Sequence, residues 1–178
     1  MENSNKKMAT RSRIGILNKD GTVESVYCHW DGYPDNNGKI LLESYQTREK
    51  VQELFVKGDM SSLHYPVSNC KYYADRGETD VSSRLDLTLD QYRSIREEYQ
   101  YYIDQNNQWW YNHLGCNFTP LEDYFKNKIL TKTKNKFNTI INETTEMGAL
   151  EQHARFGNER LQVRFLYFRL FGYHLTVG

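Results

Sequence analysis

Residues 13–30 read RIGILNKDGTVESVYCHW, and this stretch decides the fold. Apolar residues gather in residues 13–17 and again in residues 23–30, a pattern typical of two short strands. Asp20-Gly21 lies between them, and glycine accepts a positive φ without a steric cost, so the dipeptide favours a tight turn. We therefore predict an antiparallel β-hairpin over residues 13–30 that turns near Asp20-Gly21, with no helix in its second strand.

Two helices are predicted after the hairpin. Residues 31–38, DGYPDNNG, are dense in turn-forming residues and predict a loop. The apolar spacing of residues 40–45 predicts the first helix. Thr47 predicts the N-cap of a second helix, which should end at Gly58.

The middle of the chain predicts further short elements. Residues 70–74 fit a short strand, and Thr88 with Gln91 resembles a capping box for a helix that ends near Glu97. Aromatic residues dominate residues 99–111 on both sides of a polar turn, which favours a second hairpin. A single long helix over this region is the alternative.

The C-terminal third predicts mainly helices. Thr119-Pro120 is expected to start one helix and Phe137 to mark another, whereas residues 160–171 fit a helix and a strand equally well. The expected fold class is α+β: an N-terminal antiparallel β-hairpin in a small sheet packed with several helices. A flexible segment 1–8 should precede a single domain over residues 9–178, with a sheet-containing part (9–118) and a mainly helical part (119–178).

Composition limits the class of protein. The chain has 178 residues, enough for one hydrophobic core, and 23 basic against 23 acidic residues. A neutral chain does not coat nucleic acid in bulk, although the part after residue 119 has nine basic and six acidic residues. The 14 tyrosines, apolar bodies with polar tips, favour contact surfaces.

The sequence predicts no metal, cofactor or membrane segment. Cys28, Cys70 and Cys116 are widely spaced and form no CxxC pair, so free thiols in a reducing cytosol are expected. No apolar run approaches the roughly 20 residues of a membrane span. Phosphate-binding glycine loops and the signatures of zinc proteases and serine hydrolases do not occur.

The densest group of candidate site residues follows the hairpin, at CHWDGY, residues 28–33. If the second strand continues to Asp31, then His29 and Asp31 share a face, and the carboxylate could orient the imidazole as a general base. In the alternative, Asp31 caps the following turn, while His29 and Trp30 pack. Arg11 and Arg13 could grip a phosphate or carboxylate next to this group, or could form an ordinary charged strand pair.

Two further charged segments are weaker candidates. Asp75, Arg76 and Glu78 could supply an acid or an arginine clamp, or could form a solvated turn. A run of lysines after residue 125 could contact a nucleic-acid backbone, or could be a solvated helix surface. The neighbouring aromatic residues 109–111 could stack bases, but such density is more typical of a core. His29, Asp31 and His64 lack the spacing of a metal site.

The N-terminal motifs resemble a known group of proteins. Residues 9–16 (ATRSRIGI), residues 20–22 (DGT) and residues 27–34 (YCHWDGYP) are similar to the opening of small bacteriophage and mobile-element proteins without an assigned biochemical role. The resemblance extends over roughly residues 9–113. It implies a phage protein that acts in the bacterial cytosol, and such proteins often blunt host defence, as anti-CRISPR proteins do.

The leading hypothesis is therefore an inhibitor of a bacterial defence system, anti-CRISPR-like, that engages a Cas nuclease or its guide RNA. One alternative is a small nuclease or phosphodiesterase with His29 as base and Asp31 as its orienting partner. Another is a protein that binds a nucleotide-like signal. The expected binding residues are Arg11, Arg13, Tyr27, Trp30, Tyr33, Asp75, Arg76, Glu78, Lys132, Lys134 and Lys136.

Overall fold

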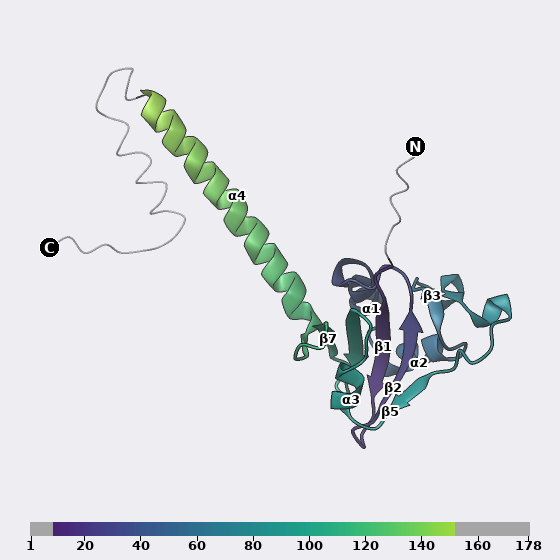
Figure 1. Ribbon diagram of the computed structural model, residues 1–178. Coiled ribbons are helices and arrows are strands. Elements are labelled where there is room, and N and C mark those ends of the chain that lie inside the picture. Colours follow the sequence, from purple (N-terminus) through teal and green to yellow (C-terminus); the bar gives the residue numbers. More distant parts are fainter. Residues whose placement is uncertain (1–8, 152–178) are drawn as a thin grey trace. The chain divides into compact units, whose positions relative to one another are not determined.

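The computed structural model describes residues 9–151, and side chains over residues 9–142 (Figure 1). Contacts divide the chain into two compact units, residues 1–129 and 130–178, which are described separately below. The predicted flexible segment 1–8 and the ambiguous segment 160–171 lie outside the described residues. The fold is α+β, as the sequence predicts.

The hairpin is confirmed. Strand β1 (Ser12–Leu17) pairs antiparallel with β2 (Val23–Cys28). The turn closes with a 2.8 Å hydrogen bond from the Asn18 amide to the Thr22 carbonyl, and Gly21 has φ +87°. A residue with a Cβ would be strained at that φ, which is why Asp-Gly is a reliable turn signal here.

The hairpin lies in the middle of one mixed sheet. Within residues 9–151 the sheet has eight strands in the order β4-β3-β2-β1-β6-β7-β8, with β5 also paired to β2. Strand β1 is parallel to β6, and β2 is parallel to β3, so both hairpin strands have partners from later in the chain. The remaining strands are β3 (Met60–Ser62), β4 (Lys71–Tyr72), β5 (Arg84–Asp86), β6 (Tyr99–Ile103), β7 (Trp109–His113) and β8 (Thr119–Pro120).

Two predicted helix caps are confirmed. Helix α1 (Lys39–Ser44) is followed by α2 (Arg48–Phe55), where the Thr47 hydroxyl accepts from the Lys50 amide at 3.4 Å. Helix α3 (Leu89–Arg93) starts with the Thr88 hydroxyl accepting from the Gln91 amide at 3.2 Å. The second hairpin, β6-β7, also forms as predicted, and residues 71–72 form β4.

Four details of the prediction are wrong. Residues 34–38, predicted as a loop, form a π-helical turn that leads into α1. Helix α3 ends at Arg93, before Glu97. The two predicted C-terminal helices are one, α4 (Leu121–Glu151), because no glycine or proline interrupts residues 121–147. Thr119-Pro120 forms edge strand β8 and does not start that helix; an edge position tolerates proline, which has no amide hydrogen to donate.

Both faces of the sheet are covered by helices. Ile14 and Ile16 of β1 join a large core with Leu41 of α1 and Leu54 of α2. The opposite face has a smaller core of Val23, Tyr92 and Tyr102, in which α3 contributes Tyr92. Gly15 lies under Tyr92, whose ring would be 3.2 Å from a Cβ at that position. The part of this second face beyond Tyr92 is polar.

Candidate functional site

A row of polar side chains crosses the second face of the sheet. Tyr27, Arg13, Gln100 and Asn112 are register partners on β2, β1, β6 and β7, so they share one face. Gln100 and Asn112 are fully or almost fully buried. Within the described side chains, Gln100 Oε1 and both amide atoms of Asn112 have no hydrogen-bond partner, which is rare in a folded interior.

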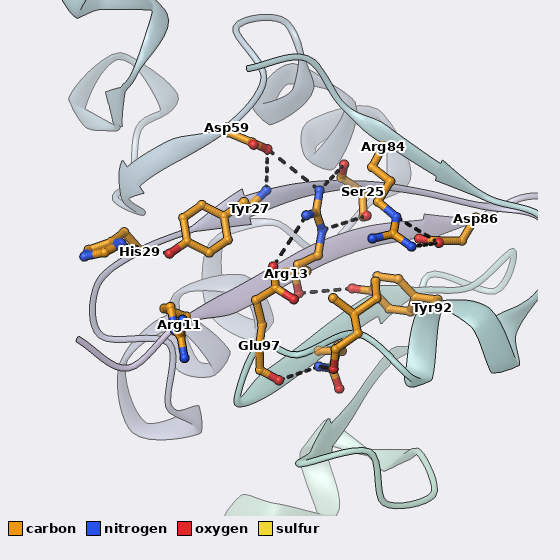
Figure 2. Close-up of polar contacts among 12 residues, drawn as sticks. Arg11, Arg13, Ser25, Tyr27, His29, Asp59, Arg84, Asp86, Tyr92 and Glu97 are labelled. Atoms are coloured by element: carbon orange, nitrogen blue, oxygen red, sulfur yellow. Dashed lines mark hydrogen bonds and ion pairs between the residues drawn. The ribbon is translucent and has the colours of Figure 1, made fainter. Parts of the chain in front are cut away.

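Arg13 is the centre of this polar row (Figure 2). The residue is only 8% exposed, and its guanidinium donates to Ser25 Oγ at 3.2 Å. It also lies 3.5 Å from Glu97 Oε1 and 3.9 Å from Asp59 Oδ1. Burial raises the pKa of Asp59, although the Tyr27 amide and Arg13 partly oppose that effect.

The two arginines predicted to bind a phosphate or carboxylate are each paired with a carboxylate of the chain itself. Arg11 contacts Glu98 through Nε at 3.3 Å and Nη2 at 3.2 Å, while Arg13 faces Glu97. Burial raises the pKa of Glu98, but its hydrogen bonds from Arg11 outweigh burial and leave that pKa lowered. A phosphate would have to compete with these carboxylates, so the charged-pair alternative describes the arginines better.

His29 is oriented by Tyr27. The Tyr27 hydroxyl and His29 Nδ1 are 2.8 Å apart, with Tyr27 on β2 and His29 directly after the end of that strand. Strand β2 ends at Cys28 and Asp31 has φ 55°, so the continuous strand required for a His29–Asp31 pair does not form. Burial raises the pKa of Tyr27 to about 12, so the partner of the imidazole is a neutral phenol, which supplies no charge to stabilise an imidazolium.

The backbone after His29 is fixed by hydrogen bonds. The Trp30 amide donates to the Ser61 carbonyl at 2.9 Å, and the Tyr101 hydroxyl donates to the Gly32 carbonyl at 2.8 Å. A Cβ at Gly32 would be 2.8 Å from the Arg11 carbonyl carbon, so only glycine fits there. Trp30 and Tyr33 are nevertheless 37% and 39% exposed. We call residues 29–33 the Trp30 loop.

Arg76 lies beside the Trp30 loop. Its Nη2 donates to Ser61 Oγ at 2.8 Å, and the carbonyl of the same serine accepts from the Trp30 amide. Asp75 pairs with Lys57 at 2.6 Å instead, and Glu78 is 4.0 Å from Arg76. Of the three residues predicted in this charged turn, the arginine is the one tied to the strand that also holds the loop.

The lysines divide between the two units. Lys126 pairs with Glu122 at 3.1 Å, and Lys128 contacts Asp35. Lys132, Lys134 and Lys136 are exposed and belong to the unit that starts at Leu130, so they are described separately from the Trp30 loop.

Base stacking by residues 109–111 is not supported. The Trp109 ring is 2% exposed, and its Nε1 donates to the Tyr45 carbonyl at 2.9 Å. Trp110 stacks on Tyr102, and Tyr111 stacks on Tyr101. These aromatic side chains therefore pack within the fold.

Other candidate chemistry is limited. Cys28 is buried, and burial raises the pKa of its thiol to about 12. Among the side chains described, no group of three histidine, cysteine or acidic residues is placed to hold a metal ion. In the same part of the chain, no helix is long and apolar enough to cross a membrane.

Asp59, Glu97, Gln100 and Asn112 are site residues that the sequence reading missed. Gln100 and Asn112 had a detectable signal, because each is a polar residue inside an aromatic strand. Asp59 and Glu97 reach Arg13 only through the tertiary fold, so local spacing could not reveal them. Comparison of the chain with protein-family models, with curated proteins and with solved structures finds no match.

Proposed function

We propose that this chain is a binding protein that inhibits a bacterial defence nuclease of the CRISPR type, and that the Trp30 loop contacts the nuclease or its guide RNA. One observation carries the binding role: Trp30 and Tyr33 are exposed rings on a backbone that buried hydrogen bonds hold in place. Tryptophan, tyrosine and arginine are the residues enriched at interface hot spots.

The rigidity of the loop supports this role. Association is weakened by the entropy lost when flexible groups become ordered, so a fixed loop binds more tightly than a mobile one with the same side chains. Arg76 adds a cation, because its guanidinium shares Ser61 with the Trp30 backbone. The aromatic loop and this cation are therefore tied to the same residue, Ser61.

The identity of the partner rests on two other features. The resemblance of residues 9–34 to phage proteins points to a bacterial target. Residues 124–142 contain five lysines and no acidic residue, which suits contact with a polyanion such as guide RNA.

A nuclease or phosphodiesterase activity is the second candidate. The contact between Tyr27 and His29 favours it, because the hydrogen bond orients the imidazole ring of a candidate general base. The phenol supplies no negative charge beside the imidazole, unlike the carboxylate partner of a typical catalytic histidine.

A titration separates the two candidates. A binding inhibitor should abolish DNA cleavage by a purified Cas nuclease at near-stoichiometric amounts, whereas an enzyme should act at trace amounts. Trp30→Ala or Tyr33→Ala should weaken inhibition about 30-fold, the equivalent of a 2 kcal/mol hot spot, and His29→Ala only slightly. Tyr65→Ala is the matched control, an exposed tyrosine outside the loop.

The opposite pattern would support the enzyme. Loss of nucleic-acid cleavage by about 10²–10⁴-fold in His29→Ala, with binding unchanged, would assign His29 as the base. If the Trp30→Ala and Tyr33→Ala proteins fold and still inhibit the nuclease fully, the Trp30 loop is not the surface that contacts it.

A further inference from the structure

A groove of about 350 Å³ lies away from the Trp30 loop, in the unit that ends at residue 129. It is bordered by the end of α1, the turn between β6 and β7, and the start of α4. Its lining is rich in primary amides, contributed by Gln46, Asn106, Asn107 and Gln108, and includes the carboxylate of Glu122. A groove of this volume is at the lower end of the range for small-ligand sites.

Three of these amides have unused hydrogen-bonding capacity. Within residues 9–142, the side chains of Gln46, Asn106 and Gln108 make no hydrogen bond, whereas Asn107 Oδ1 accepts from the Arg48 amide at 3.0 Å. Each free amide presents a donor beside an acceptor. The complementary ligand is one that also has a donor beside an acceptor.

The turn that holds two of these amides is fixed. Asp104 Oδ1 accepts from the Asn106 amide at 2.8 Å and from the Gln108 amide at 2.9 Å. Asn107 has φ 62°, a conformation that asparagine tolerates in turns. The contact between Asn107 and Arg48 anchors the turn to the start of α2, so the backbone that carries Asn106 and Gln108 is fixed next to the groove.

A cation lies next to one lining residue of the groove. Lys126 Nζ is 3.1 Å from the carboxylate of Glu122, which lines the groove, and 3.6 Å from that of Asp123, so a phosphate would share this lysine with two exposed carboxylates. Lys126 is also the first of the five lysines in residues 124–142. Amide side chains read the hydrogen-bonding edges of bases, and lysines contact phosphates. A neutral sugar would not need the neighbouring lysine, and an acidic peptide would not need three free amides, so a nucleotide fits the amides and Lys126 together best.

We propose that this groove binds an unpaired base of single-stranded RNA, with Gln46, Asn106 and Gln108 at the base edge and Lys126 at the adjoining phosphate. Proteins recognise RNA sequence mainly through such unstacked bases. The inference rests on the proposed function for the source of the RNA, the guide RNA. The groove chemistry is independent of the Trp30 loop.

The test uses the full chain and fluorescently labelled oligoribonucleotides of adenine, cytosine or uracil only, each about ten nucleotides long. Fluorescence anisotropy at low salt should give unequal affinities for the three. The double change Gln46→Leu with Gln108→Leu removes two amides at similar volume. It should weaken binding of the preferred oligonucleotide about tenfold and make the three affinities converge, without changing the salt dependence.

Two controls separate base reading from charge. Lys126→Gln should weaken all three oligonucleotides alike and lower the log–log salt slope by roughly one. Gln52→Leu, on an exposed glutamine of α2 outside the groove, should change nothing. Asn106→Ser provides a second amide deletion in case the double variant does not fold.

The proposal is overturned if the wild-type chain binds the three oligonucleotides equally or not at all. It is also overturned if the folded amide variants keep the wild-type preference. Retained nuclease inhibition in that case would leave the proposed function intact. If the chain shows a base preference but inhibits no nuclease, the groove proposal stands and the proposed function as a nuclease inhibitor is rejected.

Discussion

At the scale of single residues, Asn37 joins the hairpin to the exposed Trp30 loop. Its side chain is fully buried, and its Nδ2 lies 3.2 Å from Ser12 Oγ, 3.3 Å from Cys28 Sγ and 3.4 Å from the Trp30 carbonyl oxygen. One amide group therefore contacts both strands of the hairpin and the backbone of the loop. The position of the Trp30 backbone therefore depends on a fully buried residue.

Replacement of Asn37 by leucine should destabilise the fold by about 1–3 kcal/mol, because it leaves buried polar partners without their donor. Urea unfolding followed by tryptophan fluorescence measures this change. Asn69→Leu is the control: its amide donates to the Tyr65 carbonyl at an exposed site, so little change is expected. An Asn37→Leu protein as stable as the wild type would mean that these contacts do not hold the loop.

The sequence predicted several of these side chains as candidate site residues, but it did not predict which residues they contact. His29, Trp30 and Arg13 stood out because their residue types are dense in a short stretch. Asn37 was hidden among other turn-forming residues, since nothing in its neighbours shows that it points inward. The pairing of Arg13 with Glu97 spans most of the described chain and leaves no local trace.

At the scale of elements, the turns and helix starts that depend on neighbouring residues were predicted correctly. The Asp-Gly turn and the threonine caps of α2 and α3 involve residues at most four apart, so their signals are complete within a short window. The π-helical turn at residues 34–38 was missed because its residue types also form loops. Helix α2 ends at Phe55, shortly before Gly58, the residue predicted to stop it.

Gly58 and Gly77 form a matched pair of tests at this scale. Both have a left-handed φ, +72° and +79°, but a Cβ at Gly58 would be 1.8 Å from the Val81 carbonyl oxygen, whereas one at Gly77 meets nothing within 4 Å. Gly77→Ala should lose about 1–2 kcal/mol of stability from backbone strain alone. Gly58→Ala should lose more than about 4 kcal/mol, because the backbone has to move.

Chemical denaturation of both glycine variants measures the difference. A further readout is Asp59, which follows Gly58 and accepts from the Tyr27 amide at 2.7 Å, so Gly58→Ala should also disturb the hairpin. Equal losses in the two variants would show that the chain near Val81 does not pass so close to Gly58.

At the scale of the whole molecule, the sheet order could not be predicted from the sequence. Hairpins join neighbours in the chain, so β1-β2 and β6-β7 were accessible to prediction. The parallel contacts of β1 with β6 and of β2 with β3 depend on long crossovers, and the contact of β1 with β6 joins the two halves of the polar row. The polar row therefore depends on the sheet topology, whereas the Trp30 loop could be predicted from its motif.

Buried tyrosines throughout the fold should make its stability depend on pH in the alkaline range. Burial raises the pKa of Tyr27, Tyr102 and Tyr124 to about 12 in each case. Burial also raises the pKa of Tyr45, Tyr72, Tyr92 and Tyr101. In the unfolded chain a tyrosine loses its proton near pH 10. Between about pH 10 and 12 the unfolded state therefore binds fewer protons than the folded state.

The free energy of unfolding should consequently fall as pH rises through this window, because stability decreases with pH wherever the folded state holds more protons. Below about pH 10 the contribution of the buried phenols is fully present. Urea midpoints should therefore fall steeply toward pH 12, and tyrosinate absorbance should rise together with loss of the circular dichroism signal. The chain in strong denaturant is the control and should titrate near pH 10 without cooperativity. If most tyrosinate formed near pH 10 while the fold persisted, the phenols would not be buried as the sheet and its cores require.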